Sequence, residues 1–431
     1  MTSPLLLAAL LAGGAADPAA APPALLAAID TPAEADAFWR EARGRTPFIE
    51  RLPGGPDRMR VTFVLRSQTD AGLSAGFLLL ENRREVPLHR LAGTDILWRS
   101  AELPADARFA YYFTRPGDDA PHPDAVYYEN VRGKTRDYFA DPLSAMAFME
   151  RSDDGKVRRL SAAAGPDAPD DPALVAAKAK GRLFDYAVPS RALGEDRPVS
   201  VYVPPAAGKA PGVLLIFDRE TYLVAGELPA MLDALIAEGR IPPTIAVLVS
   251  PVDGERRSRD LPPNPAFQRF IADELMPFVR ARHAVARAPE RNVVAGSSFG
   301  GLAAMFTGLS HPELFGNVVS QSGSFWWHPA CCGKEEDETD EDRPLNAGPD
   351  ADMGWLIEQY ALRPKAPLNI FMNVGRWEGS LMLIPNRMMH HVLRAKGYDV
   401  AYREYTGGHD IVQWRATLPG ALEATIGRSR E

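Results

Sequence analysis

The decisive stretch reads Val-Val-Ala-Gly-Ser-Ser-Phe-Gly-Gly-Leu and covers residues 293–302. β-Branched and small apolar residues lead into Gly-x-Ser-x-Gly, and an apolar helical pattern follows. This order is typical of a nucleophile elbow, the sharp turn between a strand and a helix that exposes a serine. Glycines stand two residues on either side, at Gly296 and Gly300, because the turn leaves no room for side chains there. The central residue is Ser298 rather than Ser297, and we predict that it is a nucleophile.

Two candidate partners follow in the order acid, then histidine. Residues 368–374, Leu-Asn-Ile-Phe-Met-Asn-Val, are mostly apolar and indicate a buried strand, and the loop after it carries Glu378. Residues 400–405 alternate like a strand and lead into Thr-Gly-Gly-His-Asp, which contains His409. An α/β-hydrolase places its acid and its histidine after later strands in this order. We predict that His409 is the general base and then acid, and that Glu378 orients the imidazole and stabilises its charged form.

Each partner has a simpler interpretation. A loop glutamate is usually only solvated, and a Gly-Gly-His sequence can be a turn with a surface histidine. Asp399 is a competing acid, but its place at the start of a strand indicates a surface position. Asp410 adjoins the histidine and is better suited to anchoring the loop.

An acyl-transfer site also needs donors for an oxyanion. The first is the backbone N–H of the residue after the nucleophile, which is Phe299. Residues 212–217, Gly-Val-Leu-Leu-Ile-Phe, indicate a parallel strand covered on both faces. The chain continues with Asp218 and Arg219, and the N–H of Arg219 is our candidate for the second donor.

The sequence resembles a known family over nearly its whole length. Its C-terminal half is similar to the esterase D type of α/β-hydrolase and, more narrowly, to the enterochelin (ferric enterobactin) esterases. The segments that carry this resemblance are residues 296–301, 311–316, 320–327, 407–410, Trp414-Arg415 and, beside the substrate pocket, 257–264. The N-terminal half resembles the accessory domain of the same enzymes in residues 38–39, 44–50, 91–95 and 141–143.

The resemblance implies hydrolysis of the ester bonds of a catecholate siderophore, ferric or iron-free, which releases iron by destroying the chelating scaffold. It implies no cofactor, and it carries the family's catalytic triad to Ser298, Glu378 and His409. Many relatives have aspartate and then glycine after the oxyanion strand. This chain has Asp218-Arg219 instead. The backbone N–H survives that change, but the conformational freedom of glycine does not.

A ferric tris-catecholate is a bulky trianion with aromatic rims, so its pocket should combine cationic donors with flat apolar walls. Arg257 holds the place of the family's arginine and is the expected substrate contact. Arg256 and Arg259, on what we expect to be the same loop, could add charge, since guanidinium pairs with oxyanions and stacks on rings. The walls are expected from Trp326, Trp327 and Trp377.

The length of 431 residues predicts two domains. Alternating segments at 59–66 and 108–113 indicate an all-β, immunoglobulin-like sandwich over residues 23–160. A linker rich in proline and aspartate is expected at 161–178 and an α/β-hydrolase catalytic domain at 179–431.

The net charge of −8 argues against nucleic acid and against an anionic membrane surface as partners. The acidic residues 335–342 are expected to be a solvated insertion. Cys331 and Cys332 are the only cysteines, and the ligand pattern of a zinc site is absent from the sequence. No metal and no cofactor is therefore predicted.

The amino terminus indicates a compartment. Residues 5–12 are apolar and residues 14–16 are small, which is typical of a signal peptide that ends by residue 22. The apolar stretch is too short to span a bilayer. We expect export to the periplasm, with a cytoplasmic protein carrying an alanine-rich leader as the alternative.

Two other functions stay open at this point. The same fold could act on feruloyl, peptide-type or other esters, because fold does not determine substrate. A non-hydrolytic siderophore-binding protein could also have kept the fold. The sequence predicts no oligomeric state.

Overall fold

The computed structural model describes residues 22–68, 73–77, 85–116, 126–129, 135–144, 146–151, 157–169, 178–205, 208–329 and 354–427. Its contacts divide the chain into two compact units. The first unit comprises Met1–Glu150, Val157–Pro169 and Thr406–Gln413, and the second comprises Arg151–Lys156, Asp170–Tyr405 and Trp414–Glu431. Nearly all of the predicted leader, both cysteines and the acidic run lie outside the described residues.

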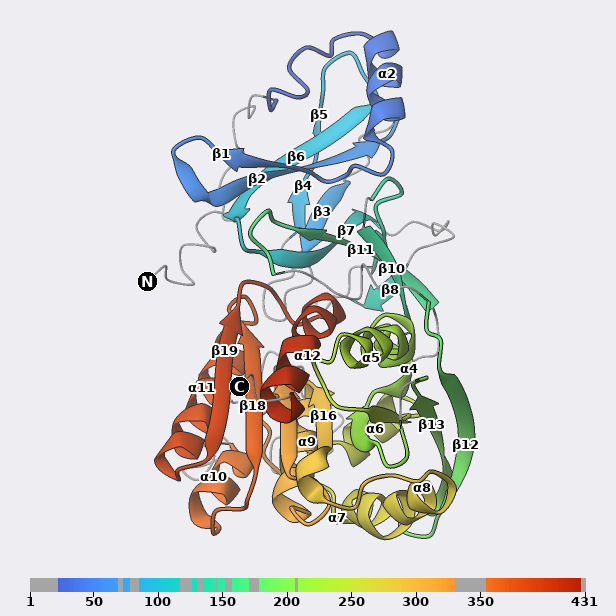
Figure 1. Cartoon of the computed structure of the whole chain (residues 1–431). Coiled ribbons are helices and arrows are strands. Elements are labelled where there is room, and N and C mark those ends of the chain that lie inside the picture. Colours follow the sequence, from blue (N-terminus) through green and yellow to red (C-terminus); the bar gives the residue numbers. More distant parts are fainter. Residues whose placement is uncertain are drawn as a thin grey trace. The chain divides into compact units, whose positions relative to one another are not determined.

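The second unit is built on an eight-stranded sheet in the order β12-β13-β15-β14-β16-β17-β18-β19 (Figure 1). Its strands are β12 (Arg182–Ser190), β13 (Glu195–Val203), β14 (Gly212–Phe217), β15 (Thr244–Val249), β16 (Asn292–Ser297), β17 (Asn317–Gln321), β18 (Asn369–Gly375) and β19 (Asp399–Tyr405). Strands from β15 to β19 along the sheet are parallel, whereas β12 and β13 pair antiparallel. Every residue of β14 is buried, which confirms the predicted strand covered on both faces.

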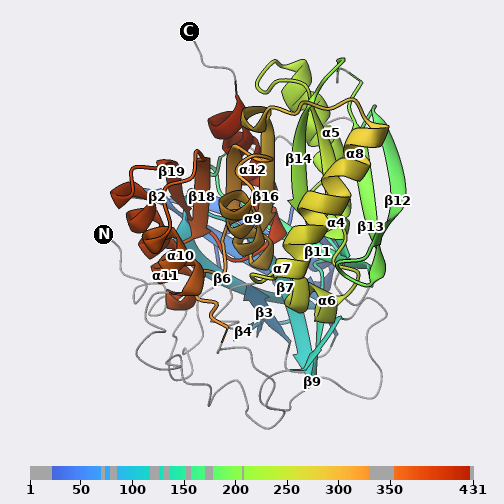
Figure 2. The same cartoon turned by 90° about the horizontal axis from the view of Figure 1, so that it is seen from below.

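Helices cover both faces of this sheet. They are α4 (Arg219–Val224), α5 (Leu228–Ala237), α6 (Gly254–Asp260), α7 (Pro265–Arg269), the π-helix η1 (Phe270–Leu275), α8 (Met276–Arg282), the 3-10 helix η2 (Pro289–Arg291), α9 (Phe299–Ser310), α10 (Trp355–Leu362), α11 (Ser380–Ala395) and α12 (Ile411–Ile426). Alternate side chains of β14, such as Leu215, share one core with α8 and α9, and Figure 2 shows these two helices in front of β14 and β16. On the opposite face, Gln321 and Asn373 donate to Thr417 of α12. The carboxyl ends of the parallel strands therefore meet at one edge, where side chains from different strands can converge.

The first unit contains two sheets, in the orders β1-β2-β6-β5 and β10-β11-β7-β3-β4, with β9 paired to β7 and β8 paired to β9. Its elements are α2 (Pro32–Ala42), β1 (Phe48–Leu52), β2 (Gly55–Arg66), β3 (Ser74–Phe77), β4 (Glu85–Pro87), β5 (His89–Arg90), β6 (Ile96–Pro104), β7 (Arg108–Pro116), β8 (Val126–Glu129), β9 (Thr135–Phe139), β10 (Met146–Arg151) and β11 (Val157–Ala164). The Phe63 ring of β2 lies 5.1 Å from the Tyr111 ring of β7, so the sheets contact each other through aromatic residues. β2 and β7 confirm the strands predicted at 59–66 and 108–113.

Three predictions about organisation need correction. The first unit is not all-β, because α2 forms behind Thr31 and Glu34, which cap its first turn reciprocally. The linker begins later than predicted, since β11 pairs with β7 through Ala164. The predicted catalytic domain is not one continuous span, because residues 406–413 belong to the first unit. The immunoglobulin-like topology stays a prediction.

Candidate active site

The predicted turn from strand to helix is present at Ser298. β16 ends at Ser297, α9 begins at Phe299, and Ser298 between them has φ 58° and ψ −123°. A Cβ on Gly296 would lie 2.4 Å from the carbonyl carbon of Gly300, so that position accepts only glycine. The elbow interpretation of this stretch is therefore confirmed as local structure.

Contacts on both sides hold this turn in place. The N–H of Ser298 donates to the carbonyl of Gln321 at 3.0 Å, and its carbonyl accepts from the N–H of Ser324 at 3.1 Å. The hydroxyl oxygens of Ser298 and Ser324 are 3.5 Å apart. Ser298 is half-buried, so solvent reaches part of a residue whose backbone is fully bonded.

Glu378 lies in the turn between β18 and α11 and is completely buried. Its Oε1 accepts from the N–H of Gly375 at 2.6 Å, from the Ser322 hydroxyl at 2.6 Å and from the Tyr405 hydroxyl at 2.8 Å. A solvated loop glutamate would show neither the burial nor the three donors. This carboxylate is therefore held in one orientation.

Sequence reasoning missed the residues that hold Glu378. Ser322 has φ 48°, a left-handed conformation, and its hydroxyl accepts from Nε1 of Trp414 at 3.0 Å. Tyr405 is the last residue of β19. Ser322 and Trp414 both lie in segments that carry the family resemblance, and this was the available signal. A segment match does not say which partner a side chain contacts.

His409 is half-buried and lies between β19 and α12, as the alternation of residues 400–405 predicted. Within the first unit, the Thr406 hydroxyl donates to Asp106 Oδ2 at 2.9 Å, and the N–H of Arg108 donates to the Thr406 carbonyl at 3.1 Å. The side chain of Gln413 donates to the carbonyl of Arg108. Both ends of the histidine segment are thus fixed. The pairing of His409 with Ser298 and Glu378 stays a prediction.

The competing acids have other surroundings. Asp399 is exposed at the first residue of β19, at the edge of the sheet opposite to the carboxyl end of β16. Asp410 is buried, and its Oδ1 accepts from the N–H of Gln413 at 3.2 Å. This contact supports the predicted anchoring of the loop by Asp410.

The predicted second oxyanion donor follows β14. Asp218 has φ 59° and ψ 52°, and Arg219 begins α4. The Arg219 side chain donates to Ser200 at 2.5 Å and to Asp185 at 3.1 Å, so its charge is directed toward β12 and β13. Only the backbone N–H could then serve an oxyanion, and that role stays a prediction.

The three arginines expected on one loop lie instead on the helix α6, which Asp253 caps by accepting from the N–H of Arg256. Arg257 donates from Nε and Nη2 to the two carboxylate oxygens of Asp218, at 2.7 and 2.9 Å. Its guanidinium carbon also lies 5.8 Å from the centre of the Phe299 ring. The predicted substrate contact of Arg257 is not tested by this pairing.

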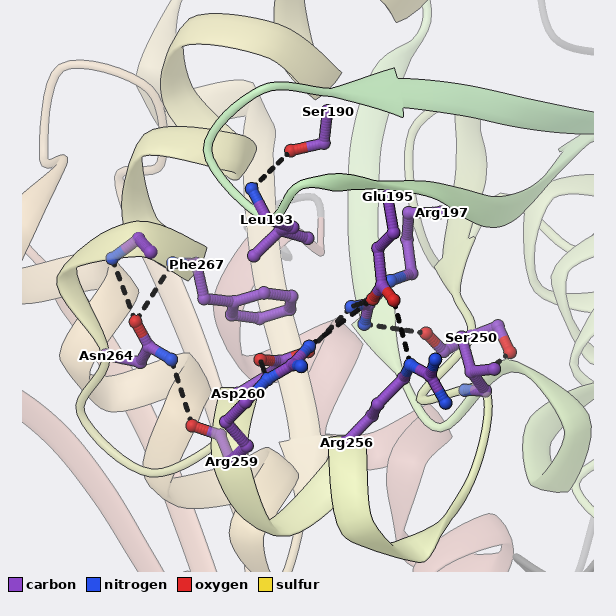
Figure 3. Close-up of polar contacts among 12 residues, drawn as sticks. Ser190, Leu193, Glu195, Arg197, Ser250, Arg256, Arg259, Asp260, Asn264 and Phe267 are labelled. Carbon is purple, nitrogen blue, oxygen red and sulfur yellow. Dashed lines mark hydrogen bonds and ion pairs between the residues drawn. The ribbon is translucent and has the colours of Figure 1, made fainter.

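Arg256 and Arg259 belong to a cluster of ion pairs centred on Glu195 (Figure 3). Arg197 and Asp260, both buried, pair there at 2.6 Å. Burial acts to raise the pKa of Glu195, but hydrogen bonds from Arg256 and Arg197 outweigh it, so this pKa lies below its usual value. The cluster fixes α6 to the hairpin of β12 and β13.

The three predicted tryptophan walls differ in burial. Trp327 is 8% exposed and packs edge-on against Trp355 in the core, which speaks against a substrate contact. Trp326 is half-buried, lies 5.8 Å from the Phe299 ring and has a buried Nε1 without an acceptor in the described part of the chain. Trp377 is half-buried beside Glu378. Trp326 and Trp377 remain predicted contacts.

The described residues show neither a candidate metal centre nor a membrane-spanning helix. No group of three or more histidine, cysteine, aspartate or glutamate side chains among them could hold a metal ion. No helix among them has the length and apolar character needed to cross a membrane.

Comparison with known proteins assigns both halves of the chain. The family described as "Putative esterase" matches residues 190–425, and the family "Enterochelin esterase, N-terminal" matches residues 60–174. The iron(III) enterobactin esterase of Dickeya dadantii is 31% identical over 424 residues, which cover 90% of this chain and 92% of that protein.

Solved structures agree with this match. The ferric enterobactin esterase of Salmonella typhimurium is 26% identical with a TM-score of 0.73, over 90% of this chain and 98% of the other. The enterobactin esterase of Shigella flexneri, determined in the presence of 2,3-dihydroxy-N-benzoyl-serine, is also 26% identical, with a TM-score of 0.70 over 90% and 97%. The identity extends across both units and nearly the full length of these relatives, and on that basis the chain belongs to the enterochelin (ferric enterobactin) esterase family.

Proposed function

We propose that this protein is a serine esterase that hydrolyses the ester bonds of catecholate siderophores and thereby releases their iron. The observation that carries the proposal is the 31% identity to an iron(III) enterobactin esterase over nine tenths of the chain. The elbow at Ser298 supports it independently, because this turn presents a nucleophile to a carbonyl carbon. The structure of the Shigella relative was determined in the presence of 2,3-dihydroxy-N-benzoyl-serine, a catechol acid of the kind that ester cleavage would release, which supports a catecholate ester as substrate.

In the proposed mechanism, Ser298 Oγ attacks the ester carbonyl while His409 takes its proton. The carbonyl oxygen becomes an oxyanion and accepts hydrogen bonds from the N–H groups of Phe299 and Arg219. Collapse of this intermediate breaks the ester bond, and the leaving alkoxide receives the proton from His409. Water, deprotonated by His409, then attacks the acyl-enzyme; the acid is released as the bond to Ser298 Oγ breaks, and His409 returns the proton to that oxygen. Glu378 orients the imidazole and stabilises its positive charge.

The burial of Glu378 supports its proposed place in this triad. A carboxylate that accepts three hydrogen bonds on Oε1 has its second oxygen, Oε2, turned in a defined direction. A fixed acceptor selects one tautomer of a histidine that donates to it. In the same proposal, Arg257 and the half-buried Trp326 and Trp377 contact the anionic, aromatic substrate. We also propose that the first unit is an immunoglobulin-like accessory domain, which its two antiparallel sheets support.

Export to the periplasm is a separate proposal. It is supported by the apolar residues 5–12 and the small residues 14–16. Amino-terminal sequencing of protein recovered from a periplasmic extract should begin near Asp17. An intact Met1 on cytoplasmic protein would contradict export and leave the activity proposal unaffected.

The activity is tested by chromatographic analysis of products after incubation with ferric and iron-free enterobactin. Wild-type protein should yield linear fragments and monomeric dihydroxybenzoylserine, and Ser298→Ala should yield none while still binding the ferric complex. Products from both forms would show that Ser298 is not the nucleophile. If wild-type protein cleaves p-nitrophenyl acetate but no catecholate ester, the serine mechanism stands and the substrate proposal fails.

A further inference from the structure

One guanidinium contacts both backbone segments that carry the predicted oxyanion donors. Arg257 forms a two-point ion pair with Asp218, the residue directly before Arg219. It also lies over the ring of Phe299, whose N–H is the other predicted donor. The Arg257 and Asp218 side chains are 18% and 7% exposed, so the pair is largely shielded from water.

Asp218 lies very close to the elbow. A Cβ added to Gly300, at the second position of α9, would lie 3.2 Å from Asp218 Oδ2. An unpaired carboxylate at this place would repel the negative charge that develops on a substrate carbonyl beside the same helix end. Arg257 cancels that charge. Because its two donors form a planar fork, it also fixes the direction of the Asp218 side chain.

The helix that carries Arg257 is itself held firmly. Arg256 donates to Glu195 at 2.8 Å, and Asp260 at the end of α6 accepts from the buried Arg197 at 2.6 Å (Figure 3). These pairs hold the helix on either side of Arg257. Arg256 and Arg259 do not reach Asp218, because Arg256 donates to Glu195 and Arg259 donates to Asp260 and Glu195.

We propose that Arg257 is a positioning residue of the oxyanion hole, which acts by neutralising Asp218 and by holding the segments of Arg219 and Phe299 at a fixed separation. The inference rests on the proposed serine mechanism but not on the siderophore as substrate. It gives Arg257 a role toward every ester, in addition to the proposed contact with the trianionic substrate, which would matter only for that substrate.

The test compares Arg257→Gln, Asp218→Asn and the double variant on p-nitrophenyl acetate, a small neutral ester without a catechol. Asparagine is a suitable replacement because it also tolerates the left-handed backbone found at Asp218. The matched control is Arg240→Gln, which removes an arginine paired with Glu423 and located before the amino end of β15. Circular dichroism and thermal unfolding check that each variant folds.

Arg257→Gln should lower kcat on this neutral ester about 100-fold with KM changed less than threefold, because displaced donors act on the transition state. The double variant should lose no more than Arg257→Gln alone, since the second substitution removes the carboxylate left uncompensated by the first. Arg240→Gln should match the wild type.

Two outcomes would overturn the inference. In the first, Arg257→Gln cleaves the neutral ester normally and loses only catecholate turnover, which makes Arg257 a substrate contact and leaves the proposed function intact. In the second, the losses of the two single variants multiply in the double variant, so that the residues act independently. If wild-type protein does not cleave catecholate esters but the Arg257 and Asp218 variants behave as expected on p-nitrophenyl acetate, the siderophore proposal fails and this inference stands.

Discussion

Ser298 has a backbone conformation that L-residues avoid, and it is also the residue whose Oγ must be exposed to the substrate. A φ of 58° with a ψ of −123° costs on the order of 1 to 3 kcal/mol. Hydrogen bonds to Gln321 and Ser324 maintain it. The same tightness reappears at Gly296, where any side chain would meet the backbone of the next turn. The strand, the serine and the two glycines could be predicted from residues 293–302 because they are requirements of one local turn.

Gly296→Ala should therefore destabilise the protein. Its Cβ would meet Gly300 at 2.4 Å, and such overpacking lowers the free energy of unfolding by about 2 to 3 kcal/mol. Gly420→Ala is the matched control, since a Cβ there meets nothing within 4 Å and Gly420 lies inside α12. That control should gain about 0.5 to 1 kcal/mol. Urea unfolding measures both, and equal stability of the two variants would contradict the clash.

A second prediction at this scale concerns Ser322. Ser322→Ala removes one of three donors to Glu378 Oε1, and a hydrogen bond to a charged group is worth about 1.5 to 3 kcal/mol. We expect kcat to fall about tenfold or more with KM nearly unchanged. Tyr405→Phe removes a second donor and should act in the same direction. Ser310→Ala, at the far end of α9 from Ser298, serves as control. Steady-state kinetics with wild-type kcat in both Ser322→Ala and Tyr405→Phe would exclude the positioning role.

At the scale of elements, hydrophobic patterning predicted the strands well and the side-chain pairing poorly. β14 is a continuous apolar run because both of its faces are covered, and β18 is mostly apolar with two asparagines, so both are visible in the sequence as buried strands. The charged run of residues 254–260 was expected to be a loop that offers cations to a substrate. It forms the helix α6, because Asp253 caps it, and Glu195 of β13 and Asp218, directly after β14, pair with its arginines. Asp218 and Arg257 are 39 positions apart, and no local pattern connects them.

The junction between α8 and β12 predicts a dependence of stability on pH. Burial, and then the charge of Arg282, lower the pKa of His283, whose Nε2 lies 3.1 Å from the Tyr186 hydroxyl. A lowered pKa means that folding favours the neutral ring. The contribution of His283 is therefore complete above the unfolded pKa of about 6.5 and is lost as the pH falls through the folded value. Wild-type protein should lose more unfolding free energy than His283→Gln between pH 7.5 and pH 5. Parallel losses in denaturant titrations would refute this.

At the scale of the whole molecule, the segment with His409 is the feature that patterning could not predict. Its position after β19 could be predicted from the order in which acid and histidine follow the strands along the chain. Its partners Asp106 and Arg108 were not, because they lie about 300 residues earlier in the turn before β7 and in β7 itself. Contacts between such distant positions arise only when the first unit has folded. A domain boundary drawn from composition could not include them.

Asp106→Ala should therefore impair turnover although Asp106 lies in the accessory half of the chain. The substitution removes the acceptor of the Thr406 hydroxyl, three residues before His409, and frees one end of that segment. We expect kcat to fall several-fold with unchanged KM, because a small misplacement of a catalytic group is costly. Asp106→Asn keeps an acceptor oxygen and should restore most of the rate. Equal kinetics for the alanine and asparagine variants would show that the contact has no part in catalysis.

The membership of residues 406–413 in the first unit also bears on how such enzymes can diverge. If the accessory half were exchanged between two relatives, residues 406–413 would contact a foreign partner at positions 106 and 108. Loss of the contacts with Asp106 or Arg108 would lower the activity of a hydrolase whose other residues are unchanged. The two halves are therefore expected to be inherited together. A recombinant of two family members should be active only when the turn before β7 and the Thr-Gly-Gly-His segment come from the same parent.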